Sequence, residues 1–430
     1  MDEPASRHDP YAALRYADYR RVLTGNVLSA LGAELQSAAV MWELFERTNS
    51  PAALGYVGLV QFLPVLLLAL PAGHAADRFS RRRLYVLAQA FMVFASLGLA
   101  ALSFAQGPIP LFYLFLTLVG VGRAFLAPVR GALMAQVVDI ADLGNAITWN
   151  SSGWQVASMV GPALGGFLIA VSRMPSWAYG LTALCGAVSL VLVSSVRPRP
   201  YQRLKEPPSL KSLLSGLHFV WQSKLILATL TLDLFAVLFG GATALLPIFA
   251  RDILEIGPVG YGWLRASPSI GALAMALVLA HRPPLRRAGL TLLLSVAGFG
   301  VATIVFGMSR DALLSFTLLA LTGALDNISI VVRGTIVHTL TPDEMRGRVS
   351  AVNSIFIVSS NELGAFESGL TAAWFGPIIS VVGGGIGTLL VVLAVMFRWP
   401  EVRRLGPLHG LAEEVPASAA TGDSATENSG

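Results

Sequence analysis

Acidic and basic side chains occur inside apolar segments that are long enough to cross a bilayer as helices. Five of them lie well inside such segments: Glu34, Arg123, Asp233, Asp326 and Glu362. An ionisable group near the bilayer midplane costs at least ~2.5 kcal/mol, so each is a functional candidate by default. A carboxyl group holds its proton more strongly where it is desolvated and less strongly beside an arginine. One that moves between two such settings can load and release a proton.

We predict that Glu34 or Asp233 is the proton-coupling carboxylate, with Asp326 as the third candidate. The alternative for each of these carboxylates is a permanent structural ion pair. Asp326 and Arg333 are one candidate pair, because they are seven residues apart on one face of a helix.

The composition excludes whole classes of protein. The chain of 430 residues is 54% hydrophobic and 13% charged, about half of the roughly 25% charged residues of soluble domains, and its mean hydropathy is +0.66. A single soluble core stops growing near about 250–300 residues, so a water-soluble enzyme and a disordered chain are both excluded. One cysteine, Cys185, and six scattered histidines provide no disulfide framework and no metal-ligand pair. We therefore expect no metal and no other cofactor. No GxxxxGKS or GxxxxGKT loop, which would bind the phosphates of ATP, occurs, so we expect no ATP-driven transport.

Twelve apolar segments match the length of a transmembrane helix. They lie at residues 22–46, 52–76, 84–105, 110–137, 146–171, 176–196, 225–250, 259–281, 288–308, 312–338, 347–371 and 376–397. Of the 30 lysines and arginines, 22 fall in the termini and the even-numbered loops and four in the opposite loops, which predicts cytoplasmic termini. The same bias explains the net charge of +5, so we expect no nucleic-acid partner. The sequence predicts an all-α polytopic protein of the plasma membrane (the inner membrane of a bacterium).

The second half of the chain repeats landmarks of the first at a shift of 203 to 205 residues. Gly161 and Gly166, for example, recur as Gly364 and Gly369. A parallel repeat predicts two six-helix bundles with a substrate site between them, which opens alternately to the two sides. The predicted segments are a cytoplasmic N-terminal segment at 1–21, bundles at 22–196 and 225–397, a cytoplasmic linker at 197–224 and a largely disordered cytoplasmic tail at 398–430.

The linker carries leucines at helical spacing, at positions 210, 213, 214 and 217. One interpretation is an amphipathic helix on the inner leaflet. The other is a cytoplasmic extension of the seventh span, and the sequence leaves both open.

The loop after the second segment carries a charged motif. Residues 73–83 read GHAADRFSRRR, which resembles the GxLxDRxGRR signature between the second and third helices of the major facilitator superfamily. Ala75 and Ser80 depart from that pattern. The resemblance implies the twelve-helix superfamily fold and a gating role for the matching residues Gly73, Asp77, Arg78, Arg81 and Arg82.

The fifth segment carries a second motif. Residues 157–166 read ASMVGPALGG and resemble the GxxxGPxxGG motif of proton-coupled exporters in that superfamily. The matching residues are Gly161, Pro162, Gly165 and Gly166, and the alternative is close helix packing with no bearing on the direction of transport. Residues 210–216 and 341–349 resemble the branch of the superfamily that holds the enterobactin exporter and the macrolide-efflux proteins.

In the superfamily fold, helices 1, 4, 7 and 10 line the central cavity, and four of the five buried charged residues fall on those segments. The polar and aromatic residues that we expect in the substrate cavity are Asn26, Gln36, Gln61, Trp149, Asn150 and Trp154. The two tryptophans are alternatively interface or packing residues. A mostly apolar pocket with a few polar groups suits an amphiphilic compound.

The resemblance and the buried charges together predict a secondary active transporter. We expect it to export a small amphiphilic compound, drug-like or siderophore-like, by proton antiport with alternating access. Its expected partners are that compound, protons and the bilayer, with the chain acting as a monomer. The alternatives are an uptake symporter on the same fold and a membrane sensor or scaffold that no longer transports.

Overall fold

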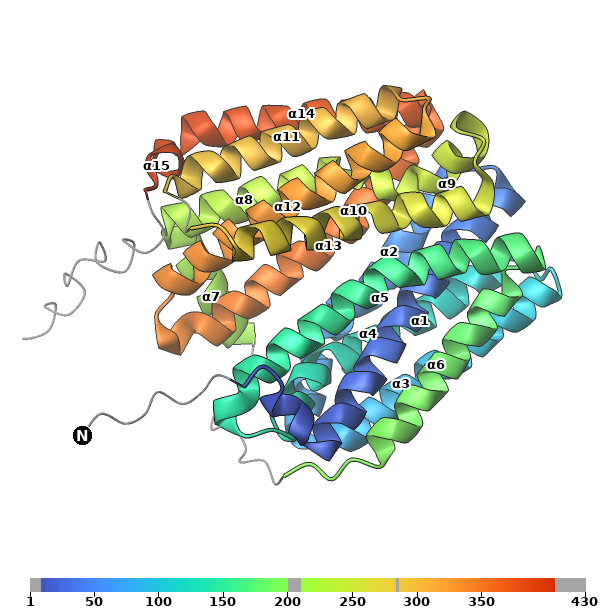
Figure 1. The fold of residues 1–430 in the computed structure, drawn as a ribbon, viewed down its shortest axis with the longest axis horizontal. Coiled ribbons are helices and arrows are strands. Elements are labelled where there is room, and N and C mark those ends of the chain that lie inside the picture. The colour runs from blue at the N-terminus through green and yellow to red at the C-terminus, as the bar shows by residue number, and fades with distance from the viewer. Residues whose placement is uncertain (1–8, 200–209, 284–285, 407–430) are drawn as a thin grey trace, which may run out of the picture.

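Every secondary-structure element in the described part of the chain is a helix. The computed structural model describes residues 9–199, 210–283 and 286–406. The predicted N-terminal segment before residue 9, linker residues 200–209 and the tail after residue 406 lie outside these ranges. The helices form two groups, one above the other in the view of Figure 1. The all-α fold class is thus confirmed.

Six long helices build the first group. They are α1 (Ala17–Thr48), α2 (Pro51–Arg78), α3 (Arg81–Phe104), α4 (Ile109–Met134), α5 (Leu143–Ser172) and α6 (Ser176–Ser194), with the 3-10 turns η1 (Ala12–Arg15) and η2 (Ile140–Asp142). Local sequence sets the helix ends. Asn49 closes α1 in the left-handed region at φ 49°, which asparagine tolerates, and Pro51 opens α2 at its first position, where no backbone donor is needed.

The second group repeats this order, but its first helix is broken. It contains α8 (Lys224–Phe239), η3 (Gly241–Leu245), α9 (Leu246–Ile248), the π-helical turn η4 (Phe249–Ile253), α10 (Gly257–Ala280), α11 (Ala288–Met308), α12 (Ala312–Leu340), α13 (Asp343–Phe375), α14 (Pro377–Arg398) and the short α15 (Pro400–Arg404). The predicted span at 225–250 is therefore interrupted after Phe239. Gly240, Gly241 and Pro247 account for the break, because glycine weakens a helix and proline lacks a backbone donor.

Ten helical segments of the described chain are long and apolar enough to cross a membrane. They coincide with ten of the twelve predicted spans. The other two predicted spans are α1 and α13, whose 32 and 33 residues are long enough but include more charged side chains, among them Glu34 and Glu362. The count of twelve spans stays a prediction, as does the cytoplasmic position of the termini.

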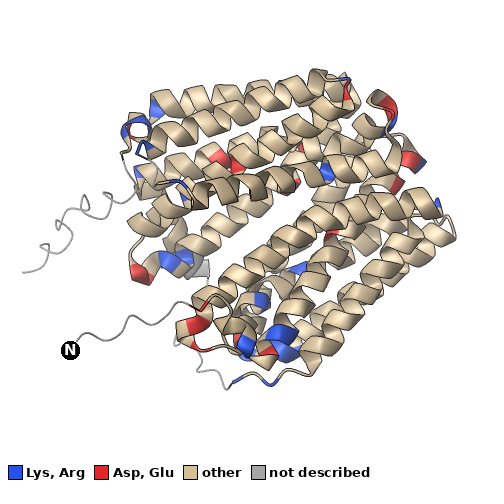
Figure 2. Ribbon diagram, viewed as in Figure 1, with Lys and Arg blue, Asp and Glu red and all other residues tan. Residues whose placement is uncertain are grey.

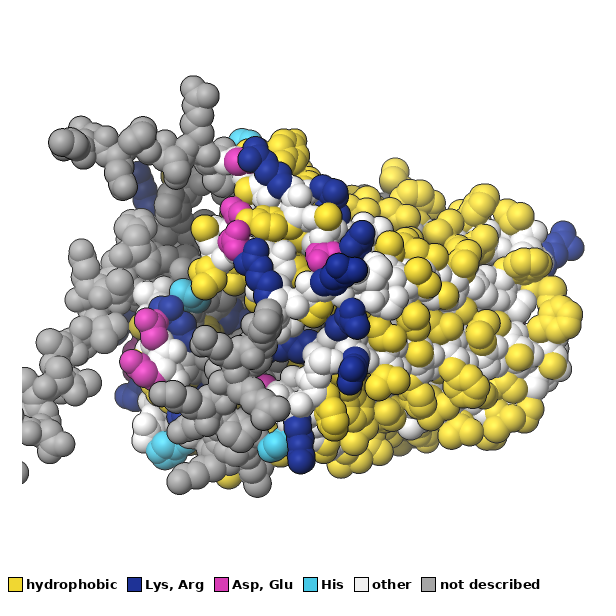
Figure 3. Space-filling view, turned by 90° about the horizontal axis from the view of Figure 1, so that it is seen from below, with side chains coloured by type: hydrophobic (Ala, Val, Ile, Leu, Met, Phe, Trp, Pro, Cys, Tyr) yellow, Lys and Arg dark blue, Asp and Glu magenta, His cyan; other side chains and the backbone are white. Residues whose placement is uncertain are grey.

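Charged side chains gather at the ends of the helices. Figure 2 shows most of the lysines and arginines at the end where the N-terminal segment enters, and Figure 3 shows them beside a broad hydrophobic surface. We term this end, which holds η1, the α2–α3 turn and α15, the basic end. Leu87, Val171 and Leu390 are among the large apolar side chains exposed on the outside of the helices, which suits contact with lipid tails.

Two helix pairs join the halves, and at both crossings glycine lets the backbones touch. Where α2 crosses α13, a Cβ on Gly369 would lie 2.6 Å from the Cα of Gly55. Where α5 crosses α10, a Cβ on Gly166 would lie 2.2 Å from the carbonyl oxygen of Pro258 and 3.0 Å from the Cα of Gly262. Small residues at a crossing allow the close approach that holds membrane helices together without a hydrophobic driving force.

Buried hydrophobic packing joins the halves at the end opposite the basic end. One cluster there takes residues from both halves, such as Leu44 and Phe249. Arg251 adds a polar contact: its Nη2 donates to Asn49 Oδ1 at 2.7 Å, and its guanidinium lies 4.1 Å from the centre of the Phe45 ring. The other buried clusters of the described chain are each confined to one half or its linker helix. The halves therefore close together at the opposite end and diverge toward the basic end (Figure 1).

The linker contains a helix of its own, α7 (Leu210–Gln222), which ends before α8 begins at Lys224. Leu217 and Val220 of α7 pack with Val349 of α13, and a Cβ on Gly216 would lie 2.9 Å from the carbonyl oxygen of Arg348. The linker helix is thus separate from the seventh span and docks on the second half. Its contact with the inner leaflet stays a prediction.

A larger residue at a glycine crossing should weaken the contact between the halves. We expect Gly369→Val to destabilise the protein by about 1–3 kcal/mol, because the new side chain overlaps the backbone of α2. The measurement is the thermal unfolding midpoint of the purified chain in detergent. Gly383→Val on α14 is the matched control, since nothing lies within 4 Å of a Cβ there. Equal midpoints for the two variants would contradict the close crossing.

Candidate functional site

A buried ion pair joins two helices inside the second half. Arg333 Nη1 of α12 pairs with Asp233 Oδ1 of α8, and the two side chains are only 6% and 9% exposed. This pair corrects the expectation that Arg333 pairs with Asp326. The two positions are seven residues apart, about 10 Å along the helix axis, and they form no ion pair in the described chain. Instead, α8 brings the carboxylate of Asp233 directly to Arg333.

Asp326 lies beside this pair and has no hydrogen bond or ion pair within the described chain. Asp233, Asp326 and Arg333 all line a cavity of about 390 Å³. The cavity lies within the second half, and α8, η3, α10, α11, α12 and α13 contribute to its walls. Its size suits a ligand or a group of water molecules. An unpaired carboxylate and an ion pair thus face the same cavity inside an apolar bundle.

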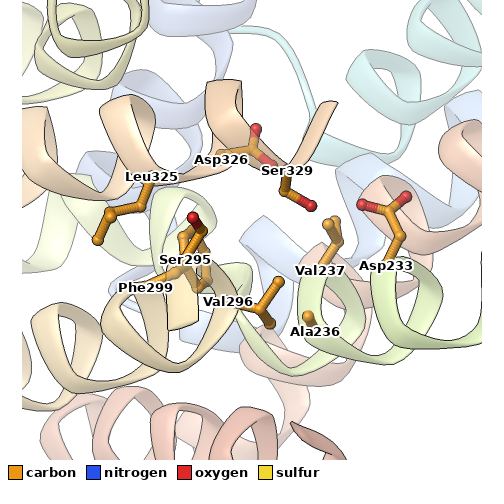
Figure 4. A pocket seen from close by; sticks show the side chains of 9 residues that line it. All are labelled: Asp233, Ala236, Val237, Ser295, Val296, Phe299, Leu325, Asp326 and Ser329. Carbon is orange, nitrogen blue, oxygen red and sulfur yellow. The ribbon is translucent and has the colours of Figure 1, made fainter. Parts of the chain in front are cut away.

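A second, much smaller space lies among α8, α11 and α12. It has a volume of about 20 Å³ and shares Asp233 and Asp326 with the larger cavity, which is room for about one water molecule. Figure 4 shows Asp233, Asp326 and Ser329 around it. Ser329 is buried, and its hydroxyl has no hydrogen-bond partner among the described residues, so it is available to a molecule in this space.

Charged side chains also link the two halves. Arg123 Nη1 of α4 lies 3.4 Å from Glu362 Oε1 of α13 and 3.1 Å from Gln61 Oε1 of α2. Arg265 of α10 donates to Ser37 Oγ of α1 at 2.7 Å, and its charge interacts with the carboxylates of Glu34 and Glu362. Two cations and two anions thus form one network across the interface.

A model of the transmembrane secretion effector family matches residues 8–409. The chain belongs to this family of major facilitator transporters. It is 28% identical over 396 residues to the enterobactin exporter EntS of Shigella flexneri, a match that covers 90% of this chain and 92% of that protein. The enterobactin exporter of Escherichia coli O1:K1 is 27% identical over 394 residues, with the same coverage.

Solved structures confirm the fold. A D-xylose–proton symporter is similar with a TM-score of 0.69 and 12% identity, covering 92% of this chain and 99% of that one. The nucleoside transporter NupG has a TM-score of 0.65 and 13% identity, covering 88% and 98%. The chain is thus a multi-pass membrane transporter with exporters among its relatives, and not an enzyme. In bacteria, such a transporter lies in the inner membrane.

The first superfamily motif lies at the basic end of the first half. Arg81 and Arg82 donate to the carbonyl oxygens of Ala132 and Val196, at 3.0 and 2.9 Å, which ties the start of α3 to the ends of α4 and α6. Asp77 Oδ2 is buried without a hydrogen-bond partner in the described chain. Gly73 lies in the last turns of α2, and Arg78 at its end is exposed.

The motif of the fifth helix packs α5 on both sides. A Cβ on Gly161 would lie 2.6 Å from the Cβ of Glu34, and one on Gly165 would lie 3.2 Å from the carbonyl oxygen of Leu35. Gly166 faces α10 at the crossing described above, and the carbonyl oxygen of Pro162 lies 2.6 Å from a Cβ built on Gly262. These four residues therefore hold α5 against α1 and α10, next to a candidate coupling carboxylate.

The predicted substrate-cavity residues are separated by the fold. Asn26 Nδ2 donates to Asn150 Oδ1 at 3.1 Å, and Gln36 accepts from Ser96 at 2.7 Å, so both buried residues bond within the first half. Gln61 belongs to the network across the halves. Trp149 Nε1 donates to the carbonyl oxygen of Pro10 at 3.0 Å, and Trp154 is 47% exposed on α5. The structure thus brings Asn26 and Asn150 together and leaves Trp154 on the surface.

Three polar residues near these groups were missed by sequence reasoning. Arg265 and Arg130 lie inside predicted spans, but nothing in the sequence indicates their partners, and Ser329 is not distinguished from the many helical serines. Only Arg130 carried a signal, since it lies 203 residues before Arg333, which is the repeat shift.

Removing one partner of the buried ion pair should destabilise the protein strongly. Asp233→Asn leaves Arg333 charged and unpaired, and Arg333→Gln leaves Asp233 unpaired, so we expect each to cost about 3–5 kcal/mol. The double variant should lose less than the sum of the two single losses, because it buries no lone charge. Thermal unfolding of all four proteins in detergent measures this. Additive losses would show that the two side chains do not interact.

Proposed function

We propose that this transporter exports a small amphiphilic compound, drug-like or siderophore-like, in exchange for protons by alternating access. Export is supported by membership of the secretion effector family and by relatives that export enterobactin. The mixed lining of the cavity in the second half, with a few polar groups among apolar ones, suits an amphiphilic cargo.

The observation that carries proton coupling is the ion pair of Asp233 and Arg333 beside the unpaired Asp326. Proton binding to Asp233 removes one charge of a desolvated pair and leaves Arg333 without its partner. Asp326 is the second carboxylate at the same cavity and is the group that can then compensate the arginine. One proton moved across 100 mV contributes about 2.3 kcal/mol, enough for a substrate gradient of roughly fifty-fold.

Alternating access is supported by the unequal contacts at the two ends of the molecule. The halves share a hydrophobic cluster at one end only, so opening that end requires the cluster to separate. The contacts of Arg123 with Glu362 and of Arg265 with Ser37 cross the same interface. Glu34, Arg123 and Glu362 are therefore proposed as groups whose partners change between the two states.

We favour Asp233 over Glu34 as the proton-coupling carboxylate. Asp233 belongs to a pair enclosed in one half and opens to a cavity. Glu34 instead lies at the interface, where the charge of Arg265 acts on it. Glu34 is thus better suited to sensing the movement of the halves.

The test is dye export from efflux-deficient bacteria that express the chain. Fluorescein and rhodamine 123 are followed with and without a protonophore. We expect at least one dye to be exported, with export abolished by the protonophore and reduced about tenfold or more by Asp233→Asn or Asp326→Asn, as expected for loss of a charged partner.

Asp311→Asn is the matched control for these variants. Asp311 caps α12 at its far end by accepting from the backbone nitrogen of Leu314, and asparagine caps a helix equally well. Export that persists in the protonophore would contradict proton coupling, and failure to move either dye would contradict export of amphiphiles.

A further inference from the structure

Arg130 is a half-buried cation to which the proposed mechanism gives no role. It lies on α4, four residues before the end of that helix, and its Nη2 donates to Ser29 Oγ at 2.7 Å. Its Nε is buried without a hydrogen-bond partner, and no carboxylate in the described chain pairs with it. A guanidinium offers five N–H donors, and buried charges are normally paired. Arg130 therefore lacks an anion.

The internal repeat shows what is missing. Arg130 and Arg333 are related by the repeat shift and lie on α4 and α12, which are the fourth membrane-spanning segments of their halves. Arg333 is neutralised by Asp233 from the first helix of its own half. At the corresponding place the first half has Ser29 and Ala30. The positive charge is thus repeated, whereas its counter-charge is not.

The neighbours of Arg130 are neutral and hydrogen-bonded to one another. Ser29 Oγ donates to Gln89 Oε1 at 3.0 Å, which leaves its oxygen free to accept from Arg130. Asn26 Nδ2 donates to Asn150 Oδ1 at 3.1 Å. Tyr85 connects this pair to Arg130, because its hydroxyl donates to Asn26 Oδ1 at 3.1 Å and also interacts with the guanidinium. The Nδ2 group of Asn150 makes no hydrogen bond within the described chain, so a free amide donor lies in the same polar network as the guanidinium.

The position of Arg130 makes it accessible from the space between the halves. Arg123 lies two helical turns earlier on the same face of α4, and it reaches Glu362 of the second half. Arg130 is itself partly exposed, and the buried clusters at its level are confined to single halves. A molecule that enters from the basic end can therefore meet this arginine before it reaches the closed end.

We propose that Arg130, with the amide of Asn150, binds an acidic group of the transported compound. The proposal rests on the proposed function for the statement that the ligand is cargo. The planar guanidinium fork matches the two oxygens of a carboxylate or sulfonate. Arg123 is compensated by Glu362, whereas the unpaired charge of Arg130 repels a cation at this place, so the cargo is an amphiphile with an anionic group.

The test compares two dyes that share a xanthene ring system but differ in charge. Fluorescein is anionic and rhodamine 123 is cationic, and each is titrated with the purified full-length chain in detergent while fluorescence polarisation is recorded. We expect the unmodified chain to bind fluorescein more tightly than rhodamine 123. Arg130→Gln should weaken fluorescein binding about tenfold or more, as expected for loss of a charged hydrogen bond, and should not weaken rhodamine 123 binding.

Three further variants separate binding from folding. Arg130→Lys keeps the charge and should retain part of the fluorescein affinity, and Arg310→Gln, at an exposed position, should leave it unchanged. Asn150→Asp places a carboxylate in the polar network of Arg130 and should lower fluorescein affinity while rhodamine 123 binding is maintained or improved. This last variant keeps the test decisive if Arg130→Gln does not fold.

Three results would overturn the proposal: equal fluorescein affinity in the unmodified chain and both Arg130→Gln and Asn150→Asp, tighter binding of rhodamine 123, or no binding of either dye. Because the titration needs no proton gradient, its result is independent of whether export is proton-coupled. A chain that fails the dye-export test can still bind fluorescein through Arg130, so the two failures are distinguishable.

Discussion

The hydrocarbon core of a bilayer provides no water to solvate polar groups, and this constraint organises the structure. Backbone groups meet this constraint by forming the hydrogen bonds of helices, and charged side chains meet it by forming ion pairs with one another. Asp233 and Arg333 are paired across two helices of one half, and Arg123 and Glu362 across the two halves. Each pair fixes which faces of its helices meet, so the rotation of α4, α8, α12 and α13 follows from where the charges find partners.

Ion pairs within one half and ion pairs across the two halves would respond differently if the halves moved relative to each other. A pair inside one half travels with that half and changes only when a proton or a ligand arrives. A pair across the halves lasts only while the interface that contains it is closed. In the proposed mechanism, the second half therefore responds to protons and the interface responds to position. The site inferred for an acidic group in the first half is separate from both.

The positions of the helices could be predicted from the sequence, whereas the ion-pair and hydrogen-bond partners of the charged side chains could not. Apolar runs fixed where helices lie, and the glycines of 157–166 indicated the close packing of α5 that the structure contains. The break after Phe239 was missed because the apolar run continues through Gly240 and Gly241. The pairing of Arg333 was wrong because helical periodicity describes one helix, whereas Asp233 reaches it from a neighbour. Arg265 received no role for the same reason, since Ser37 and Glu34 belong to another helix.

The glycine crossings have a mechanical consequence. Gly55 and Gly369 form one backbone contact and Gly166 and Gly262 the other, and two such contacts define a line. If the halves rotated, interdigitated side chains at a crossing would have to separate and change rotamers. Contacts between glycine backbones have no side chains that need to do so. In the proposed alternating access, the two crossings would define a hinge axis, and the hydrophobic cluster beyond them would hold that end closed.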